Sequence, residues 1–149
     1  MEYESPVLQS SQLIQIYQCF CDETRLRILN VLSRGPLCVC HLQELLGESQ
    51  VKVSKHLGFL KGKGLVEVER HQNWMIYSLP AKRTAELDAN LQCLQDCVQS
   101  HPIFKSDLRR LAAMSPKTGW LAEVSACASK NAQSPPSKGR KSAADKCCK

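Results

Sequence analysis

The stretch from residue 36 to residue 60, PLCVCHLQELLGESQVKVSKHLGFL, constrains the fold most, because it has the pattern of two short helices joined by a tight turn. Apolar side chains recur at helical spacing on both sides of Gly47. Gly47 is suited to end the first helix, and Ser49 to cap the second. Such a pair predicts a helix–turn–helix unit. Its inward positions are Val39, Leu42, Leu45 and Leu46 in the first helix and Val53, Leu57 and Leu60 in the second.

The segments before and after this pair extend the pattern. Residues 13–20 and 21–35 have apolar side chains at helical spacing, and Asp22 is placed to cap the second of these helices. Residues 65–79 change to an alternating pattern, with two extended runs around a polar turn at 71–73. That change of period predicts a β-hairpin.

A long helix is expected from about residue 82 to residue 100, and residues 103–114 have the pattern of a further short helix. This order predicts a mainly α fold with a β-hairpin wing, a winged helix–turn–helix. The alternative is a small α+β domain whose hairpin only covers the core. We expect the winged domain to span 1–101. The C-terminal extension, 102–149, is expected to be largely a disordered basic tail, because Ser, Lys, Ala and Pro dominate its sequence beyond residue 115.

Charge and cysteine content limit the possible partners and compartment. The net charge of +6 favours an anionic partner, either nucleic acid or a membrane surface. No apolar run approaches the roughly 20 residues that cross a bilayer, and the N-terminal MEYESPVLQSSQ is acidic and polar, unlike a secretory signal. We therefore expect a cytoplasmic protein with no membrane partner. The cysteines, nine in number, are then expected to be core residues, metal ligands or sensor thiols rather than a disulfide framework.

The second short helix carries side chains that suit a DNA major groove. Gln can pair bidentately with adenine, while Lys reaches guanine acceptors or phosphate. Basic residues at the hairpin tip suit phosphates or the minor groove. Each lysine taken singly fits a solvated surface equally well, and His56 fits a packing role better than base reading. The expected DNA-binding residues are Gln50, Lys52, Ser54, Lys55, Lys61, Arg70 and His71.

One short recognition helix makes few base contacts, so a protein of this size is expected to bind DNA as a two-fold homodimer. The first helix and the long helix at 82–100 have apolar side chains for such an interface, although part of this surface must pack within the protomer. These side chains are Leu13, Ile14, Ile16 and Tyr17 on one helix and Leu87, Leu91, Leu94 and Val98 on the other.

Cys38 and Cys40 stand two residues apart at the start of the helix–turn–helix unit. Residues two apart point about 200° from each other in a regular helix, so the pair binds one ion only from an extended or unwound backbone. A helix start favours thiolates and unwinds easily. Ion binding and DNA binding would therefore compete, as in a sensor. The alternative is that one cysteine is a small buried apolar residue and the other has no role.

The runs LCVCHL and SQVKVSKHLGFLKGKGLVEVERHQNWMIYSL, with DETRLRIL upstream, resemble the ArsR/SmtB family of bacterial metal-responsive repressors. The resemblance covers about residues 10–100, and the arsenical-sensing branch carries a Leu-Cys-Val-Cys-Asp-Leu motif. It implies a dimeric winged-helix repressor, without a required cofactor, that leaves its operator when As(III) or Sb(III) binds. By position it makes Cys38 and Cys40 the inducer ligands, 50–60 the recognition helix and 65–79 the wing.

The sequence departs from that motif at two positions. His41 replaces the usual Asp, and Gln43 stands where many arsenical sensors have a third cysteine. Trivalent arsenic prefers three sulfur ligands, so either two suffice, as with a monomethylated arsenical, or another cysteine contributes. Asn90 replaces the first His of the family's zinc-type site, so zinc is not expected there. The candidate donors for a third ligand or second site are Cys93 and Cys97, with His101 one turn on; Cys19, Cys21, Cys147 and Cys148 are alternates.

Other functions compete with this interpretation. A Cd(II)- or Pb(II)-responsive repressor of the same fold is the nearest, although residues 1–18 lack the thiolates that such sensors add from an N-terminal arm. A thiol-redox or persulfide sensor would pair Cys21 with Cys93 or Cys97. An enzyme such as a thiol-dependent arsenate reductase would need an anion-cradling loop, which PLCVC lacks, so no catalytic residue is assigned. A constitutive nucleoid-type DNA binder would not respond to any inducer.

Overall fold

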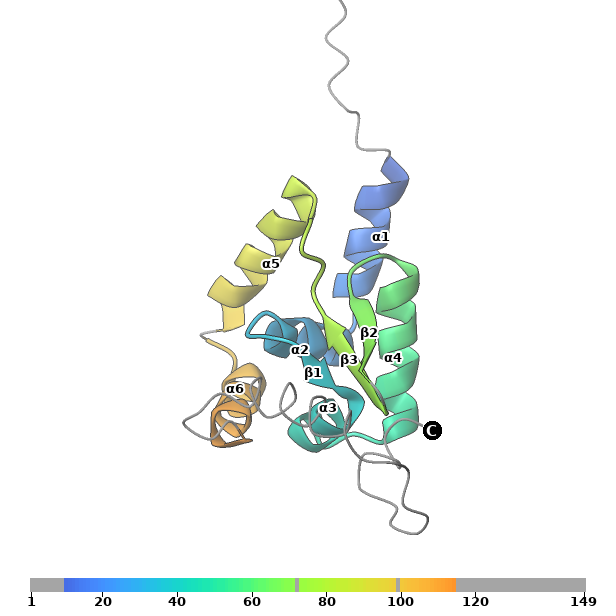
Figure 1. Cartoon of the computed structure of the whole chain (residues 1–149). Coiled ribbons are helices and arrows are strands. Elements are labelled where there is room, and N and C mark those ends of the chain that lie inside the picture. The colour runs from blue at the N-terminus through green and yellow to red at the C-terminus, as the bar shows by residue number, and fades with distance from the viewer. Residues whose placement is uncertain (1–9, 72, 99, 115–149) are drawn as a thin grey trace, which may run out of the picture.

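Six helices and a three-stranded sheet form the part of the chain that the structure describes, residues 10–71, 73–98 and 100–114. The structure is a computed structural model (Figure 1), and its element order is that of the predicted winged helix–turn–helix. The elements are α1 (Ser10–Phe20), α2 (Glu23–Leu32), β1 (Leu37–Cys38), α3 (Val39–Leu46), α4 (Gln50–Gly62), β2 (Glu67–His71), β3 (Trp74–Ser78), α5 (Ala85–Val98) and α6 (Pro102–Met114).

Helix α2 lies at the centre of the fold and packs against each of the other five described helices. Asp22 caps its first turn as predicted, because the Asp22 Oδ1 accepts the backbone N–H of Arg25 at 3.0 Å. Residues 27–32 are all buried, so this part of α2 is surrounded rather than amphipathic.

Helices α3 and α4 form the helix–turn–helix unit, and both of its predicted boundaries are confirmed. Gly47 ends α3 in the left-handed region at φ +65°, and its N–H donates to the Gln43 carbonyl at 3.0 Å. Ser49 caps α4, because its Oγ accepts the Lys52 N–H at 3.3 Å. All the predicted inward positions are buried, and none is more than 6% exposed.

The wing is the predicted hairpin with one strand added. Strands β2 and β3 pair in antiparallel register, from Glu67 opposite Ser78 to His71 opposite Trp74. The sequence did not predict β1, which pairs with the other side of β3 and gives the strand order β1-β3-β2. This strand precedes α3 directly, so the sheet is joined to the start of the helix–turn–helix unit.

Helix α5 begins later than expected, at Ala85, because Thr84 precedes it as a cap whose Oγ1 accepts the Leu87 N–H at 3.3 Å. Helix α6 packs against α2, α3 and α5, with Phe104 and Leu111 in the core. The packed structure therefore extends past the boundary expected at residue 101. The tail expected beyond residue 115, with Cys147 and Cys148, lies outside the described residues.

Candidate nucleic-acid interface and thiol site

The outer face of α4 presents the side chains predicted to meet DNA. Val53, Leu57 and Leu60 are fully buried on the inner face, which anchors the helix against the core. The outward positions are polar or basic. Lys52, Ser54, Lys55 and Lys61 are exposed, and Gln50 is partly buried.

Lys52 makes an ion pair within the helix–turn–helix unit. Its Nζ lies 2.9 Å from Oε1 of Glu48, and that hydrogen bond lowers the pKa of the Glu48 carboxyl. The Lys52 side chain is 46% exposed. An ion pair this exposed stabilises the fold only weakly, so Lys52 can exchange Glu48 for another anion.

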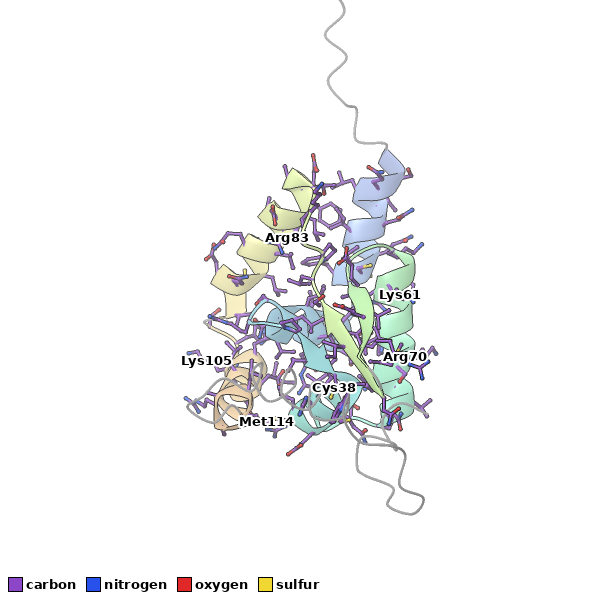
Figure 2. The ribbon with its side chains drawn as sticks, in the orientation of Figure 1. Cys38, Lys61, Arg70, Arg83, Lys105 and Met114 are labelled. Carbon is purple, nitrogen blue, oxygen red and sulfur yellow. The ribbon has the colours of Figure 1, made fainter. Side chains whose placement is uncertain are left out.

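The wing adds basic side chains beside α4. Arg70 is exposed on β2, opposite Met75 of β3. Figure 2 places Lys61 and Arg70 on the same side of the molecule, along α4 and the adjoining β2. His71 is the last residue of β2, but its side chain lies outside the described set.

A buried ion pair fastens α6 to the helix–turn–helix unit. The Arg27 Nε and Nη2 donate to the two Asp107 carboxylate oxygens, each at 2.7 Å, and both side chains are nearly inaccessible to solvent. Arg27 Nη2 also donates to the Leu46 carbonyl at 3.1 Å, and Arg110 Nη1 donates to the Leu45 carbonyl at 3.1 Å. These bonds satisfy carbonyls at the end of α3, next to the turn.

Arg27 and Asp107 are not among the functional residues expected from the sequence, although the sequence contains a signal for both. Each charge lies within an apolar pattern, Arg27 beside Ile28 and Asp107 between Phe104 and Leu111. A charge on an inward face implies a buried partner. Their separation of 80 positions hides which partner it is.

Cys38 and Cys40 occupy different backbone environments. Cys38 is the last residue of β1 and the N-cap of α3, with extended backbone angles and a side chain that makes no capping hydrogen bond. Its side chain is buried, only 1% exposed. Cys40 lies in the first turn of α3, is partly buried, and is disulfide-bonded.

His41 brings an imidazole to this thiol. Its Nδ1 lies 3.1 Å from Sγ of Cys38, within hydrogen-bonding distance. On its other side the ring is stacked on Trp74 of β3, with centroids 6.3 Å apart and planes 12° from parallel. From the sequence, His41 stands out only as a departure from a motif.

The donor chemistry of this site fits a soft ion once Cys40 is reduced, since two thiolates and an imidazole nitrogen are soft or intermediate ligands. Within residues 10–71, 73–98 and 100–114, however, no cluster of three or more His, Cys, Asp or Glu side chains is arranged to hold a metal ion. The two sulfurs would therefore have to come together by a local change in backbone.

The other cysteines lie on other helices. Cys93 and Cys97 are exposed free thiols one turn apart on α5, and the hydrogen bond with Cys93 raises the pKa of Cys97. Cys19 is buried in α1, and burial raises the pKa of this thiol to about 11, while Cys21 is exposed. A thiol such as Cys19 is a poor nucleophile and ligand.

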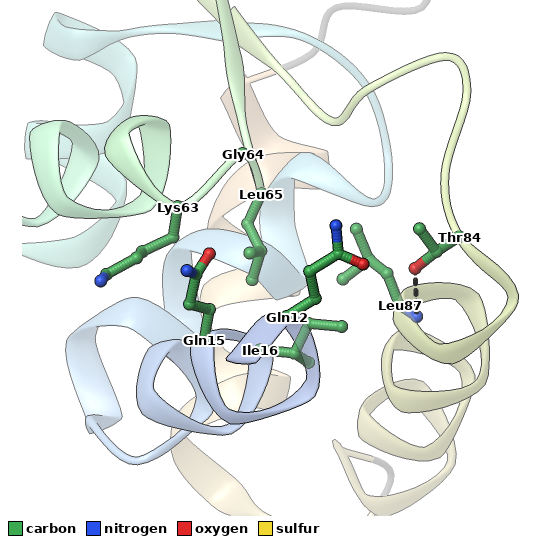
Figure 3. A pocket seen from close by; sticks show the side chains of 8 residues that line it. All are labelled: Gln12, Gln15, Ile16, Lys63, Gly64, Leu65, Thr84 and Leu87. Atoms are coloured by element: carbon green, nitrogen blue, oxygen red, sulfur yellow. Dashed lines mark hydrogen bonds between the residues drawn. The ribbon is translucent and has the colours of Figure 1, made fainter. Parts of the chain in front are cut away.

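The two helices expected to form a dimer differ in what they leave exposed. The apolar stripe of α5 is buried within the protomer, mainly against α2. On α1, Ile14 is 54% and Tyr17 55% exposed. A pocket separates α1 from the start of α5, with Gln12, Leu65 and Leu87 among its walls (Figure 3).

Comparison with known proteins gives one consistent result. The family model described as bacterial regulatory protein, arsR family, matches residues 22–68. The arsenical resistance operon repressor of Escherichia coli (strain K12) is 39% identical over 92 residues, which cover 58% of this chain and 79% of that protein. The arsenic resistance transcriptional regulator ArsR1 of Pseudomonas putida is 35% identical over 100 residues, which cover 66% of this chain and 77% of that protein.

Solved structures share the same fold. HlyU from Vibrio cholerae N16961 superposes with a TM-score of 0.54 at 28% sequence identity, covering 60% of this chain and 95% of that one. In the described part of this chain, no helix has the length and apolar character needed to cross a membrane.

Proposed function

The chain belongs to the ArsR family of bacterial transcriptional regulators, and on that premise we propose that it is a repressor released from DNA by trivalent arsenic or antimony. In this proposal α4 and the wing bind the operator, and Cys38 and Cys40 are the inducer ligands. The observation that carries it is the position of Cys38, at the junction of β1 and α3. Relatives named for arsenical and arsenic resistance support the choice of ion.

The DNA-binding surface follows from the exposed face of α4. Gln50, Lys52, Ser54 and Lys55 enter the major groove, where each good bidentate base contact is worth about 1–3 kcal/mol of discrimination. Lys61, Arg70 and His71 contact phosphates or the minor groove. The relatives are named as a repressor and a transcriptional regulator rather than as enzymes.

The response to the ion follows from the backbone at the two thiols. Cys38 is extended and Cys40 is helical, so gathering both sulfurs around one centre unwinds the first turn of α3. The buried Val39 and Leu42 move with it, which displaces α3 relative to α4. DNA binding and ion binding then oppose each other.

The number of sulfur ligands selects among arsenicals. Cys38 and Cys40 satisfy a monomethylated arsenical, whereas arsenite or antimonite takes a third thiolate, for which exposed Cys93 and Cys97 are the candidates. Both require Cys40 in its reduced form, because only a thiolate is a ligand.

The proposal includes a homodimer. Ile14 and Tyr17 are more than half exposed on α1. Apolar side chains gathered on one exposed helix are typical of an interface. Two copies related by a two-fold axis then present two α4 helices to one operator.

The test is fluorescence anisotropy of the reduced full-length protein on labelled promoter DNA from its own gene neighbourhood. Arsenite, antimonite, monomethylarsenite, cadmium, zinc and a thiol oxidant are each titrated into the complex. The same titrations are made with Cys38→Ser and with the Cys93→Ser, Cys97→Ser double variant.

We expect trivalent arsenic or antimony to release the wild type but not Cys38→Ser. Release of Cys38→Ser at wild-type concentrations would remove Cys38 from the site and move the sensor to α5. Release by cadmium alone would establish the Cd(II)/Pb(II) alternative, and release by oxidant alone the thiol-redox one. Binding that no agent reverses would indicate a constitutive DNA binder.

A further inference from the structure

Cys38 belongs to the wing sheet as well as to the helix–turn–helix unit. Its backbone pairs with Ile76 of β3, and Leu37 pairs with Tyr77. In the next residue the chain enters α3. Figure 2 places Cys38 where β1 meets α3, beside the hairpin. A displacement of Cys38 therefore acts on two elements, the first turn of α3 and the strand β3.

A second path leads from the same thiol to the wing through side chains. The Cys38 Sγ lies 3.1 Å from the His41 Nδ1, and the His41 ring is stacked on the indole of Trp74. A centroid distance of 6.3 Å with an angle of 12° is an offset stack, within the range in which aromatic pairs attract. Trp74 is the first residue of β3 and pairs with His71, so the path ends at the wing turn.

We propose that His41 and Trp74 are positioning residues that transmit the state of the Cys38 thiol to the wing. The inference rests on the proposed function and names the second element that inducer binding moves. With Cys38 uncomplexed, the thiol holds His41, and His41 holds the wing against α3. The wing and α4 then present one rigid surface to DNA.

Ion binding breaks this path for two reasons. A Cys38 sulfur bound to an ion has no proton to donate to Nδ1, and it is a weaker acceptor because it shares one electron pair with the ion, so its hydrogen bond with His41 weakens. The side chain is also only 1% exposed, so it must turn outward to reach an ion shared with Cys40. Both changes release the His41 ring from its place on Trp74. The wing contacts with DNA are then lost together with those of α4.

The chain offers a direct probe of this path. It contains two tryptophans, Trp74 and Trp120, so a Trp120→Phe variant of the full-length protein reports on Trp74 alone. The reduced variant is titrated with arsenite, and its emission is recorded beside the anisotropy of the operator complex. The same pair of titrations is made with His41→Phe and His41→Gln added to the variant.

We expect the Trp74 emission to change saturably, with the same midpoint as operator release. His41→Phe can stack on Trp74 but cannot hydrogen-bond to the thiol, whereas His41→Gln can hydrogen-bond but cannot stack. Each variant should lose the emission change while the protein still binds arsenite. Glu44→Gln is the control on the same helix, because Glu44 is exposed and belongs to no candidate ligand set, and it should keep the full response.

An unchanged Trp74 emission while arsenite releases the operator would overturn the path but leave the proposed function standing. A full emission response in both His41 variants would also overturn it. If arsenite neither releases the operator nor changes the emission, the proposed function itself fails, and the two failures are thereby distinguished.

Discussion

Asp22 links two helices through a single carboxylate. It caps α2 through the Arg25 N–H, and its Oδ1 lies 3.8 Å from the His56 Nδ1 on the recognition helix. Burial raises the pKa of this carboxyl, but the hydrogen bond from Arg25 and the charges of His56 and Arg25 outweigh burial and bring the pKa below its usual value. The ionised form is therefore favoured in the folded protein.

Asp22→Ala should lower the free energy of unfolding at pH 7 by about 1 kcal/mol, the usual value of an N-cap. The pKa of Asp22 is lower in the folded protein than in the unfolded chain, where it is about 4. The stabilisation by this cap is therefore complete above about pH 4 and disappears as the pH falls through the pKa of the folded protein. Urea denaturation at pH 7 and below pH 3 measures it. The exposed Glu44→Ala is the control, and a deficit that persists in acid would contradict the account.

At the scale of elements, α6 supports the helix–turn–helix unit from behind. Arg27, Asp107 and Arg110 connect it to the carbonyls at the end of α3, and Arg27 Nη1 lies 4.0 Å from Glu48, the partner of Lys52. Charged groups therefore run from α6 to the DNA-facing surface. The position of the turn depends on this helix as well as on the core.

Asp107→Asn should lower the free energy of unfolding by about 3–5 kcal/mol, because it leaves the Arg27 guanidinium buried without a counter-charge. Asp88→Asn removes the exposed ion pair with Arg83 and should cost no more than about 1 kcal/mol. Chemical denaturation of both variants gives the comparison. Equal effects would show that α6 does not anchor the fold.

Local patterns predicted the elements, and pairings between distant residues account for what was missed. Val53, Leu57 and Leu60, with caps at Ser49 and Gly47, determine α4 and its turn through neighbours within a few positions. β1 exists only because Leu37 and Cys38 meet β3, and α6 joins the core through Arg27, 80 positions away. The motif predicted Cys38 and Cys40 as a pair of ligands. The stack of His41 on Trp74, in contrast, depends on how the wing folds back.

At the scale of the whole molecule, basic residues are placed on the face that carries α4 and the wing. Lys55 and Lys61 are exposed there, while Lys105 lies on α6 at the opposite edge of Figure 2. Phosphate contacts release counterions, so each of them steepens the loss of affinity with salt.

Lys55→Ala should weaken operator binding and reduce the slope of log affinity against log salt by about 1. Lys105→Ala removes the same charge from the other side and should leave the slope unchanged. Anisotropy titrations between about 50 and 200 mM salt measure both. An equal reduction in the two variants would mean that net charge, rather than the α4 face, governs binding.

Association of two protomers depends on the exposed apolar side chains of α1. Ile14→Glu should convert the dimer to monomer and weaken operator binding, while the circular dichroism spectrum is retained, because Ile14 is 54% exposed within the protomer. Ala112→Glu, at an exposed position of α6 away from this surface, is the control for charge. Sedimentation velocity measures the oligomeric state of both variants. A dimer that persists in Ile14→Glu would place the interface elsewhere.

The central claim is that inducer binding at Cys38 and operator binding exclude each other, so the most direct measurement is the arsenite affinity of the reduced protein with and without saturating operator DNA. Linkage requires the operator to weaken arsenite binding by the same factor by which arsenite weakens operator binding, typically about 5- to 150-fold. We predict equal factors of this size for the wild type and none for Cys38→Ser. Identical arsenite affinities in the free and operator-bound wild type would contradict the account.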